Sequence, residues 1–249
     1  MAKNKLAKFA DMDALSNVFQ PKHEEVFESE YKLKGKWGKE VFKNDNPIVL
    51  EIGCGKGEYA VGLARKFPNK NFIGMDIKGS RMWTGATQSE SEGLTNVIFI
   101  RSYAEFLESV FADDELSEIW VTFADPQMKK ARKRLTGTRF LRHYKKVLKE
   151  DGIIHLKTDS NFLYTYTSIM AKENKLEVSV DTNNLYESGT ADEILSIRTY
   201  YEQQWLDRGK TIKYIRFSLK GKIEFIEPEV EIEEDDYRSY SRSKKQNGE

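Results

Sequence analysis

A glycine-rich turn between an apolar strand and a helix constrains this chain more than any other feature. The turn lies in Ile48-Val-Leu-Glu-Ile-Gly-Cys-Gly-Lys-Gly57, and a second apolar strand, Asn71-Phe-Ile-Gly-Met-Asp76, follows the helical stretch. This order of elements is the first half of a nucleotide-binding α/β sheet. Asp76 follows Gly53 by 23 residues, close to the spacing of about 20 expected for an acid that binds a ribose.

Short apolar runs alternate with helical patterns along most of the chain. Tyr59–Phe67, for example, repeats apolar residues at helical spacing and is closed by Pro68. Such alternation predicts right-handed crossovers and a mostly parallel sheet with helices on both faces. The sequence therefore predicts a Rossmann-like α/β fold with seven strands. The strand candidates are Ile48–Ile52, Asn71–Met75, Val97–Ile100, Glu118–Phe123, Ile153–Leu156, Leu176–Val180 and Ile212–Leu219.

Composition divides the chain into three parts. Residues 1–46 are polar and lysine-rich with scattered aromatics, so we expect a partly mobile N-terminal extension that docks on the core or on a ligand. Residues 47–222 carry the alternating pattern and form the predicted α/β domain. Residues 223–249 hold eight acids between Glu224 and Asp236 and then a basic, serine-rich end, so we expect a flexible, charged C-terminal tail.

Bulk composition excludes several classes of protein. Lys plus Arg equals Asp plus Glu at 40 each, but the charges are clustered, and clustering rather than net charge decides nucleic-acid binding. The single cysteine, Cys54, excludes an intramolecular disulfide and argues against a thiolate metal site. No apolar run reaches about 18 residues, so the sequence predicts no membrane span. We also expect no metal ion and a cytoplasmic location.

The glycine turn discriminates among three classes of cofactor. A phosphate-binding P-loop has Ser or Thr after Gly-Lys, but Gly57 follows Lys56 here. A dinucleotide fingerprint has a third glycine where Glu58 lies, and a carboxylate there would repel a pyrophosphate. S-adenosylmethionine has no phosphate, so it tolerates acids beside a turn that Gly53 and Gly55 let it approach closely.

Two acids beside the turn fit the same cofactor. Glu51 lies two residues before Gly53, and Asp76 can accept hydrogen bonds from both ribose hydroxyls. The sequence therefore predicts S-adenosylmethionine as the cofactor. The alternatives are a nicotinamide cofactor and a glycine-rich turn that binds no ligand.

A dense basic segment follows the fourth strand candidate. The strand leads into Asp125-Pro126, and five of the six residues 129–134 are Lys or Arg. Because this strand is expected beside the one that carries the glycine turn, Asp125 should lie near the reactive part of the cofactor, with the cations facing a polyanion. The alternative is a solvated lysine-rich loop. Asp159 ends the fifth strand in the same way, and either points into the crevice or caps the helix that starts after Ser160.

These motifs resemble those of the bacterial tRNA (guanine-N7)-methyltransferases, a family of class I S-adenosylmethionine-dependent enzymes. The resemblance spans about residues 48–219 and keeps the motif order. It implies a class I methyltransferase domain at residues 47–222 and methyl transfer to N7 of a guanine in the tRNA variable loop. The matching motifs are Glu51-Ile-Gly-Cys-Gly-Lys-Gly57, Gly74-Met-Asp76, Phe123-Ala-Asp-Pro-Gln-Met-Lys-Lys-Ala-Arg-Lys-Arg-Leu135, Thr158-Asp159 and Arg198-Thr-Tyr-Tyr-Glu202.

The resemblance also implies roles for individual residues. Asp125 matches an acid associated with catalysis and cofactor contact. The cofactor-binding set is Glu51, Gly53, Gly55, Asp76, Tyr103 and Asp125. The substrate-binding set is Lys129, Lys130, Arg132, Arg134, Asp159, Thr199, Tyr200, Tyr201 and Glu202. The partner would be tRNA, bound by a monomer or a homodimer.

Two positions depart from the family pattern. The family usually has Pro-Asp-Pro-Trp where this chain has Ala124-Asp-Pro-Gln127, so the stacking that a tryptophan offers is missing. Tyr103 stands where an Asp or Asn usually contacts the adenine region, and a tyrosine would stack there instead.

The alternative functions are another S-adenosylmethionine-dependent methyltransferase acting on RNA or a small molecule, a non-catalytic RNA-binding protein, and a nicotinamide-dependent oxidoreductase.

Overall fold

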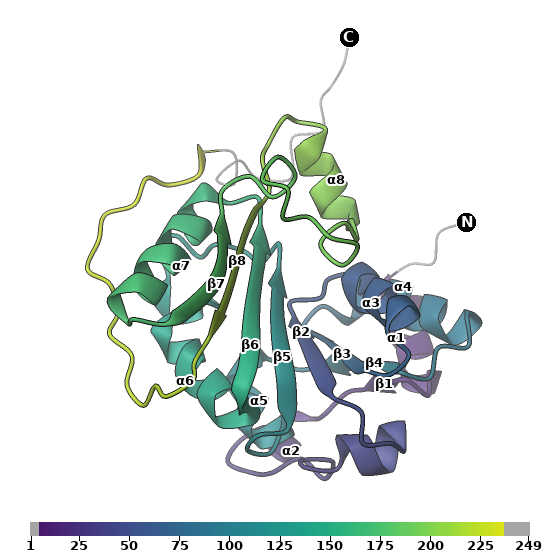
Figure 1. Ribbon diagram of the computed structural model, residues 1–249. Coiled ribbons are helices and arrows are strands. Elements are labelled where there is room, and N and C mark those ends of the chain that lie inside the picture. The colour runs from purple at the N-terminus through teal and green to yellow at the C-terminus, as the bar shows by residue number, and fades with distance from the viewer. Residues whose placement is uncertain (1–4, 237–249) are drawn as a thin grey trace.

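One mixed sheet of eight strands organises residues 5–236, the part of the chain that the computed structural model describes (Figure 1). The strand order is β1-β4-β3-β2-β5-β6-β8-β7, and neighbours are parallel except that β8 runs antiparallel to β6 and β7. The strands are β1 (Val18–Phe19), β2 (Ile48–Ile52), β3 (Asn71–Asp76), β4 (Val97–Arg101), β5 (Leu116–Thr122), β6 (Leu148–Thr158), β7 (Glu177–Thr182) and β8 (Lys213–Ser218).

Helices connect the strands. The α-helices are α1 (Lys5–Ala14), α2 (His23–Val26), α3 (Glu58–Lys66), α4 (Gly79–Ser91), α5 (Leu107–Val110), α6 (Thr138–Val147), α7 (Asn161–Glu173) and α8 (Tyr200–Leu206). A π-helix, η1 (Trp37–Phe42), and two 3₁₀ turns, η2 (Ala104–Phe106) and η3 (Ala131–Lys133), complete the set within the described residues.

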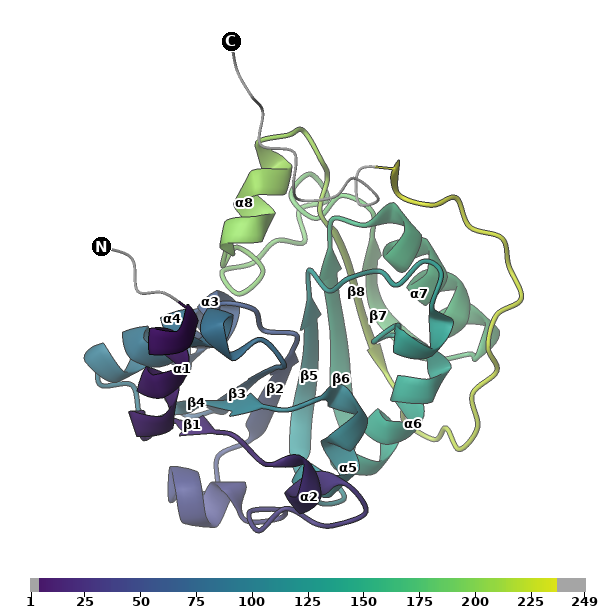
Figure 2. The same ribbon diagram turned by 180° about the vertical axis from the view of Figure 1, so that it is seen from behind.

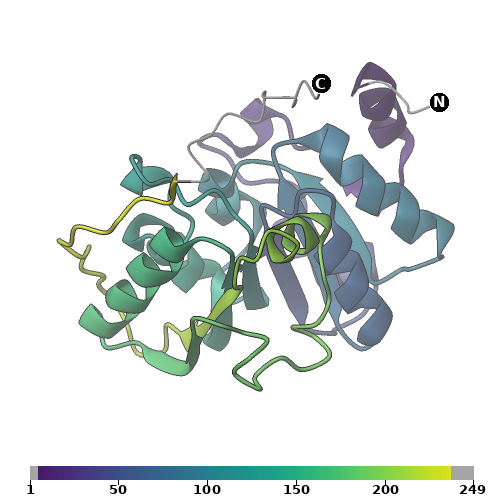
Figure 3. The same ribbon diagram turned by 90° about the horizontal axis from the view of Figure 1, so that it is seen from above.

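The sheet is covered on both faces (Figure 3). Val49 belongs to a core cluster with α3 and α4, whereas the next residue, Leu50, belongs to a cluster with α5, α6 and α7. Successive side chains of a strand point to opposite faces, so a strand covered on both sides is apolar along its whole length. The four apolar residues of β2 are buried for this reason, and Glu51 is buried among them.

The sequence predicted seven strands, and the structure contains all seven. The eighth, β1, has two residues, Val18 and Phe19, which pair with β4. A strand this short carries no alternating pattern, so periodicity could not reveal it. The strand β6 also begins at Leu148 instead of Ile153, because Leu148 pairs with Leu116 of β5.

Residues 5–46 pack against the α/β domain. Helix α1 contacts α4, and Met12 and Val26 are buried in the two core clusters. Trp37 is fully buried, and its indole Nε1 donates a hydrogen bond to the carbonyl oxygen of Val110 at 2.9 Å. The described part of the N-terminal segment is therefore docked on the core.

Residues 223–236 run along α6 and α7 at the outside of the molecule (Figure 1). Phe225 and Asp235 are buried, and the Glu227 carboxylate accepts hydrogen bonds from the side chains of Thr138 and Tyr166. Residues 223–236 of the predicted flexible tail therefore make side-chain contacts with the domain. Residues 237–249 of the predicted tail lie outside the described residues.

Within residues 5–236, no helix is long and apolar enough to span a bilayer. The same residues contain no cluster of three or more His, Cys, Asp or Glu side chains placed to hold a metal ion.

Candidate active site

The carboxyl ends of four parallel strands meet along one edge of the sheet. The strands β3, β2, β5 and β6 are neighbours in that order, and the strand order reverses between β2 and β5. Open α/β sheets bind ligands at such a reversal point. Helix α8 lies beyond this edge, on the same side of the molecule (Figures 1 and 2).

The glycine turn follows β2 at this point. Gly53, Gly55 and Gly57 all have positive φ, at 76°, 58° and 73°, which non-glycine residues adopt only with strain. A Cβ at Gly57 would lie 2.4 Å from the Phe99 ring, so packing alone requires that glycine. At Gly53 and Gly55 the nearest atom to such a Cβ would be 3.9 and 4.0 Å away. These two glycines therefore present open backbone to a ligand.

The Asp76 carboxylate at the end of β3 is locked to the same turn. Its Oδ2 accepts a hydrogen bond from the Gly55 amide at 3.0 Å, and its Oδ1 accepts one from the Lys78 amide at 2.8 Å. Each carboxylate oxygen keeps a further lone pair. The half-buried Asp76 side chain is therefore preorganised to accept hydrogen bonds from vicinal hydroxyls.

The Glu51 side chain is buried inside the protein, next to the glycine turn, and is not exposed at the site. The side chain is 3% exposed and accepts hydrogen bonds from Thr122 Oγ1 at 2.5 Å and from the Ala60 amide at 3.0 Å. Burial raises its pKa to about 7, against the opposing effect of these two hydrogen bonds. Glu51 thus joins β2, β5 and the start of α3, and supports the turn that Gly53 begins.

Asp125 is exposed and lies in a strained loop. Phe123 and Gln127 on either side of it have φ of 50° and 51°, conformations that cost about 1–3 kcal/mol each in non-glycine residues. The Gln127 amide donates to Asp125 Oδ1 at 3.0 Å. The loop thereby directs the acid into a surface hollow that is lined by Asp125, Gln127, Met128, Lys129, Lys130 and Glu234.

The basic segment separates into two groups. Lys129, Lys130 and Arg132 are exposed, and the Lys129 ammonium lies 3.9 Å from the Glu234 carboxylate. Arg134 is 5% exposed and faces inward, with its guanidinium 4.0 Å from the centre of the Tyr166 ring.

Arg134 holds the loop that contains Asp125. Its guanidinium donates hydrogen bonds of 3.3–3.4 Å to the carbonyl oxygens of Pro126, Gln127 and Met128. The sequence predicted a substrate contact here. The structure instead shows contacts within the protein, because Arg134 alone among these cations turns toward the core.

Asp159 directly follows β6 and is 1% exposed. The Lys213 ammonium donates to its carbonyl oxygen at 3.1 Å. Helix α7 is capped by Ser160, whose Oγ accepts from the Leu163 amide at 2.9 Å. The alternative that Asp159 is the capping residue is therefore wrong, because the cap falls one residue later.

The motif at residues 199–202 forms the start of α8. Thr199 caps this helix by accepting from the Glu202 amide at 3.1 Å. Glu202 is fully buried, with its carboxylate 2.9 Å from Lys157 Nζ and 2.5 Å from the Tyr186 hydroxyl. Buried charges in proteins are paired in this way, so Glu202 anchors α8 to β6.

Two tyrosines present exposed rings at the site. Tyr200 is 50% exposed, and the ammonium of Lys56 from the glycine turn lies 3.7 Å from its ring centre. Tyr103, at the end of β4, is 56% exposed. Tyr201 is partly buried, with Arg81 5.7 Å from its ring.

Sequence reasoning missed three residues that the site depends on. Lys157 is fully buried in β6, and the one signal was a lysine inside an apolar strand. Thr122 and Asp235 carried no signal. Thr122 becomes a partner of Glu51 through strand pairing, and Asp235 hydrogen-bonds the Ser160 hydroxyl across 75 positions of sequence.

The open backbone at Gly53 and Gly55, together with Asp76, fits a ligand that carries a ribose and no phosphate. The N-terminus of α3 adds amide donors, while Glu58 beside it disfavours a pyrophosphate. The donor set therefore fits S-adenosylmethionine better than a dinucleotide.

Fold and site together define a Rossmann-like class I methyltransferase. Solved structures with the same fold include the 16S rRNA methyltransferase KamB, with a TM-score of 0.55 and 14% identity over 76% of this chain and 92% of that one. Another is a variant 16S rRNA (adenine(1408)-N(1))-methyltransferase with cosubstrate SAM from Catenulisporales acidiphilia. Its TM-score is 0.50 and its identity 13%, over 80% of this chain and 93% of that one.

Closer relatives define the family. Residues 45–215 match the methyltransferase family Methyltransf_4. The tRNA (guanine-N(7)-)-methyltransferase of Bacteroides fragilis (strain YCH46) is 60% identical over 98% of this chain and 97% of that protein. The chain belongs to the bacterial tRNA (guanine-N(7)-)-methyltransferase family, which confirms the resemblance found in its motifs.

Proposed function

We propose that this chain transfers a methyl group from S-adenosylmethionine to N7 of a guanine in the variable loop of tRNA. The observation that carries the proposal is the hollow in the loop after β5, where the exposed Asp125 carboxylate lies together with Lys129 and Lys130. An acid alone would suit many substrates, but an acid flanked by exposed cations suits a purine within a polyanion. Family membership supports the same assignment.

The cofactor would lie across the carboxyl ends of β2 and β3. Gly53 and Gly55 would contact it through their backbone, and Asp76 would bind its ribose hydroxyls. When bound, S-adenosylmethionine supplies an electrophilic methyl group on a sulfonium. Tyr103 is exposed at the end of the next strand and offers a face for adenine stacking.

Asp125 acts on charge rather than on a proton. Guanine N7 carries an in-plane lone pair and requires no general base, so the protein has to align the reactants. Methylation leaves the purine with a positive charge. A carboxylate preorganised by the Gln127 amide stabilises that charge as it develops, or accepts hydrogen bonds from the guanine edge.

The exposed cations would hold the RNA. Lys129, Lys130 and Arg132 extend into solvent and can reach phosphates, which fix the register of the RNA but do not read its sequence. The target guanine has to leave its stacked surroundings to reach Asp125, as in other base-modifying enzymes. Tyr200, exposed at the start of α8, offers a ring on which the displaced base can stack.

Four residues predicted to contact substrate take a positioning role in this proposal. Arg134 holds the Asp125 loop, and Thr199 and Glu202 fix the start of α8. Asp159 contributes through the turn between β6 and α7.

The proposal also includes a methyltransferase domain at residues 47–222, a cytoplasmic location and a monomeric or homodimeric state.

The test is direct. The protein is incubated with isotopically labelled methyl donor and unmodified tRNA, and the tRNA is digested to nucleosides. Label in 7-methylguanosine from the variable loop is the expected result. Label in a different nucleoside, or transfer to metabolites but not to tRNA, would contradict the proposal.

A further inference from the structure

The C-terminal segment, residues 223–236, contacts two loops of the candidate active site. It lies beyond residues 45–215, the part of the chain that matches the family. Asp235 in this segment nevertheless contacts both the loop after β5, which contains Asp125, and the turn after β6, which contains Asp159.

Asp235 makes the central contacts. Its carboxylate accepts hydrogen bonds from the Ser160 hydroxyl and, at 3.2 Å, from the Phe162 amide. Its own amide faces the sulfur of Met128 at 3.1 Å. Asp235 is 6% exposed although it stands in a run of acids, so these contacts offset the desolvation of a charged group.

The contacts reach the two predicted site acids through one bond network. Ser160 follows Asp159 directly and caps α7, so Asp235 fixes the turn that places Asp159. Met128 lies three residues after Asp125 in the strained loop. One residue therefore joins the loop of Asp125 to the turn of Asp159.

Glu227 provides a second attachment. Its carboxylate accepts hydrogen bonds from Thr138 at 2.5 Å and from the Tyr166 hydroxyl at 2.6 Å. The Tyr166 ring lies against Arg134, which holds the carbonyl oxygens of residues 126–128. The segment thus reaches the Asp125 loop by two independent routes.

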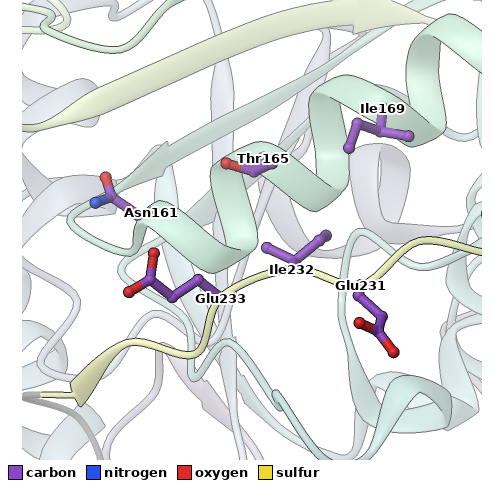
Figure 4. Close-up of a pocket in the computed structure, with 6 residues that line it drawn as sticks. All are labelled: Asn161, Thr165, Ile169, Glu231, Ile232 and Glu233. Carbon is purple, nitrogen blue, oxygen red and sulfur yellow. The ribbon is translucent and has the colours of Figure 1, made fainter.

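Between these attachments the segment lies along α7. Ile232 faces the helix beside Thr165 and Ile169, and Glu233 lies near Asn161 at the helix start (Figure 4). Residues 231–233 thus lie against α7 between the attachments at Glu227 and Asp235.

We propose that Asp235 is a positioning residue for methyl transfer, which sets the relative placement of the Asp125 loop and the Asp159 turn. The inference rests on the function proposed above. It predicts that Asp235 affects the chemical step and the order of the Asp125 loop, and leaves the cofactor site at β2 and β3 unchanged.

Three variants test this role. Asp235→Ala removes the acceptor for Ser160 and Phe162. Asp235→Asn keeps an acceptor for the Phe162 amide and a polar partner for Ser160. Glu229→Ala removes an exposed acid of the same segment and serves as the matched control.

The expected result for Asp235→Ala is a fall in kcat on the order of tenfold, because small misplacements of reacting groups lower rates steeply. The Kd for S-adenosylmethionine, measured by calorimetry, should stay within about twofold, since Gly53, Gly55 and Asp76 are untouched. Amide hydrogen exchange should accelerate across residues 125–134. Asp235→Asn should recover most of the rate, and Glu229→Ala should behave as the wild type.

An unchanged kcat per folded molecule in Asp235→Ala, or exchange in residues 125–134 equal to that of Glu229→Ala, would overturn the proposal. Should Asp235→Ala fail to fold, Asp235→Asn carries the test. A modest fall in kcat together with faster exchange in residues 125–134 would support the proposal, and a fall in kcat without any change in exchange, or no change in either, would contradict it. If the wild type made no 7-methylguanosine, the proposed function would fail, while the exchange comparison would still report on the positioning role.

Discussion

The cofactor side and the substrate side of this site are built in different ways. Around Gly53 and Asp76 the geometry comes from local backbone conformation and from two adjacent strands, and the two hydrogen bonds of the Asp76 carboxylate join residues 2 and 21 positions apart. Around Asp125 local hydrogen bonds from the Gln127 amide and from Arg134 are joined by supports from far away in the sequence. Met128 contacts Asp235, 107 positions later, and in the predicted substrate motif Glu202 anchors α8 to Lys157, 45 positions earlier.

This difference suggests how the two sides serve function. A methyl donor is the same for every reaction, so a compact preformed cradle suits it. A tRNA is large and charged, and the exposed loop with Lys129 and Lys130 is held in part by Arg134 and by the C-terminal segment. Among proteins that share a fold, the loops on the substrate side can differ while the cofactor-binding side stays the same.

The largest expected effect comes from replacing Asp125. Asp125→Ala should lower the rate of methyl transfer to tRNA by on the order of 100-fold or more, because the carboxylate that stabilises the developing purine charge is gone. Thermal unfolding should change little, since the side chain is exposed. Asp151→Ala, an exposed acid early in β6, is the control. Normal turnover in the Asp125 variant would remove this residue from the mechanism.

The next effect concerns the attachment of α8. Glu202→Ala leaves the fully buried Lys157 ammonium without its carboxylate partner, and breaking such a pair costs about 3–5 kcal/mol of unfolding free energy. Urea titration measures the loss. The double variant Lys157→Met/Glu202→Leu should regain much of that stability, because no uncompensated charge remains. A single variant as stable as Glu187→Ala, which removes an exposed acid from the same region, would show that the pair does not anchor the helix.

A smaller, pH-dependent effect belongs to the cofactor side. The pKa of Glu51 is raised by burial to about 7, so folding favours the protonated carboxyl. Its contribution to stability is present below the ordinary pKa of 4.5 and is lost as pH rises through 7, to an extent of about 3 kcal/mol. Unfolding free energies at pH 5 and pH 8 should therefore differ less in Glu51→Gln than in the wild type. Identical pH dependence in the two proteins would contradict this assignment.

The smallest effect is electrostatic and lies on the substrate side. Replacing Lys129 and Lys130 by alanine should weaken tRNA binding. The slope of log affinity against log salt should fall by about one unit for each phosphate that the loop no longer neutralises. Filter binding across a salt series measures the slope. Lys220→Ala, an exposed lysine after β8, is the control. An unchanged slope would place the RNA elsewhere on the molecule.

Sequence reasoning succeeded where chemistry and local geometry coincide. The seven strand candidates and the place of Asp76 at the end of β3 follow from periodicity, and the glycine turn follows from positive φ, which few other residue types adopt. Of the two alternatives for Asp159, the structure excludes the capping role, and the predicted substrate residues Arg134 and Glu202 are buried. Whether a charged side chain turns outward or inward depends on the partners that packing supplies, and those partners are not visible in a motif.

By itself, the sequence determined the α/β sheet, the cofactor turn and the clustering of cations after β5, because strand periodicity, positive φ and charge are local properties of the chain. Only the tertiary structure decided that Arg134, Glu202 and Asp235 act within the protein. Their partners lie between 6 and 107 positions away, and a buried charge takes its role from whichever group folding brings beside it.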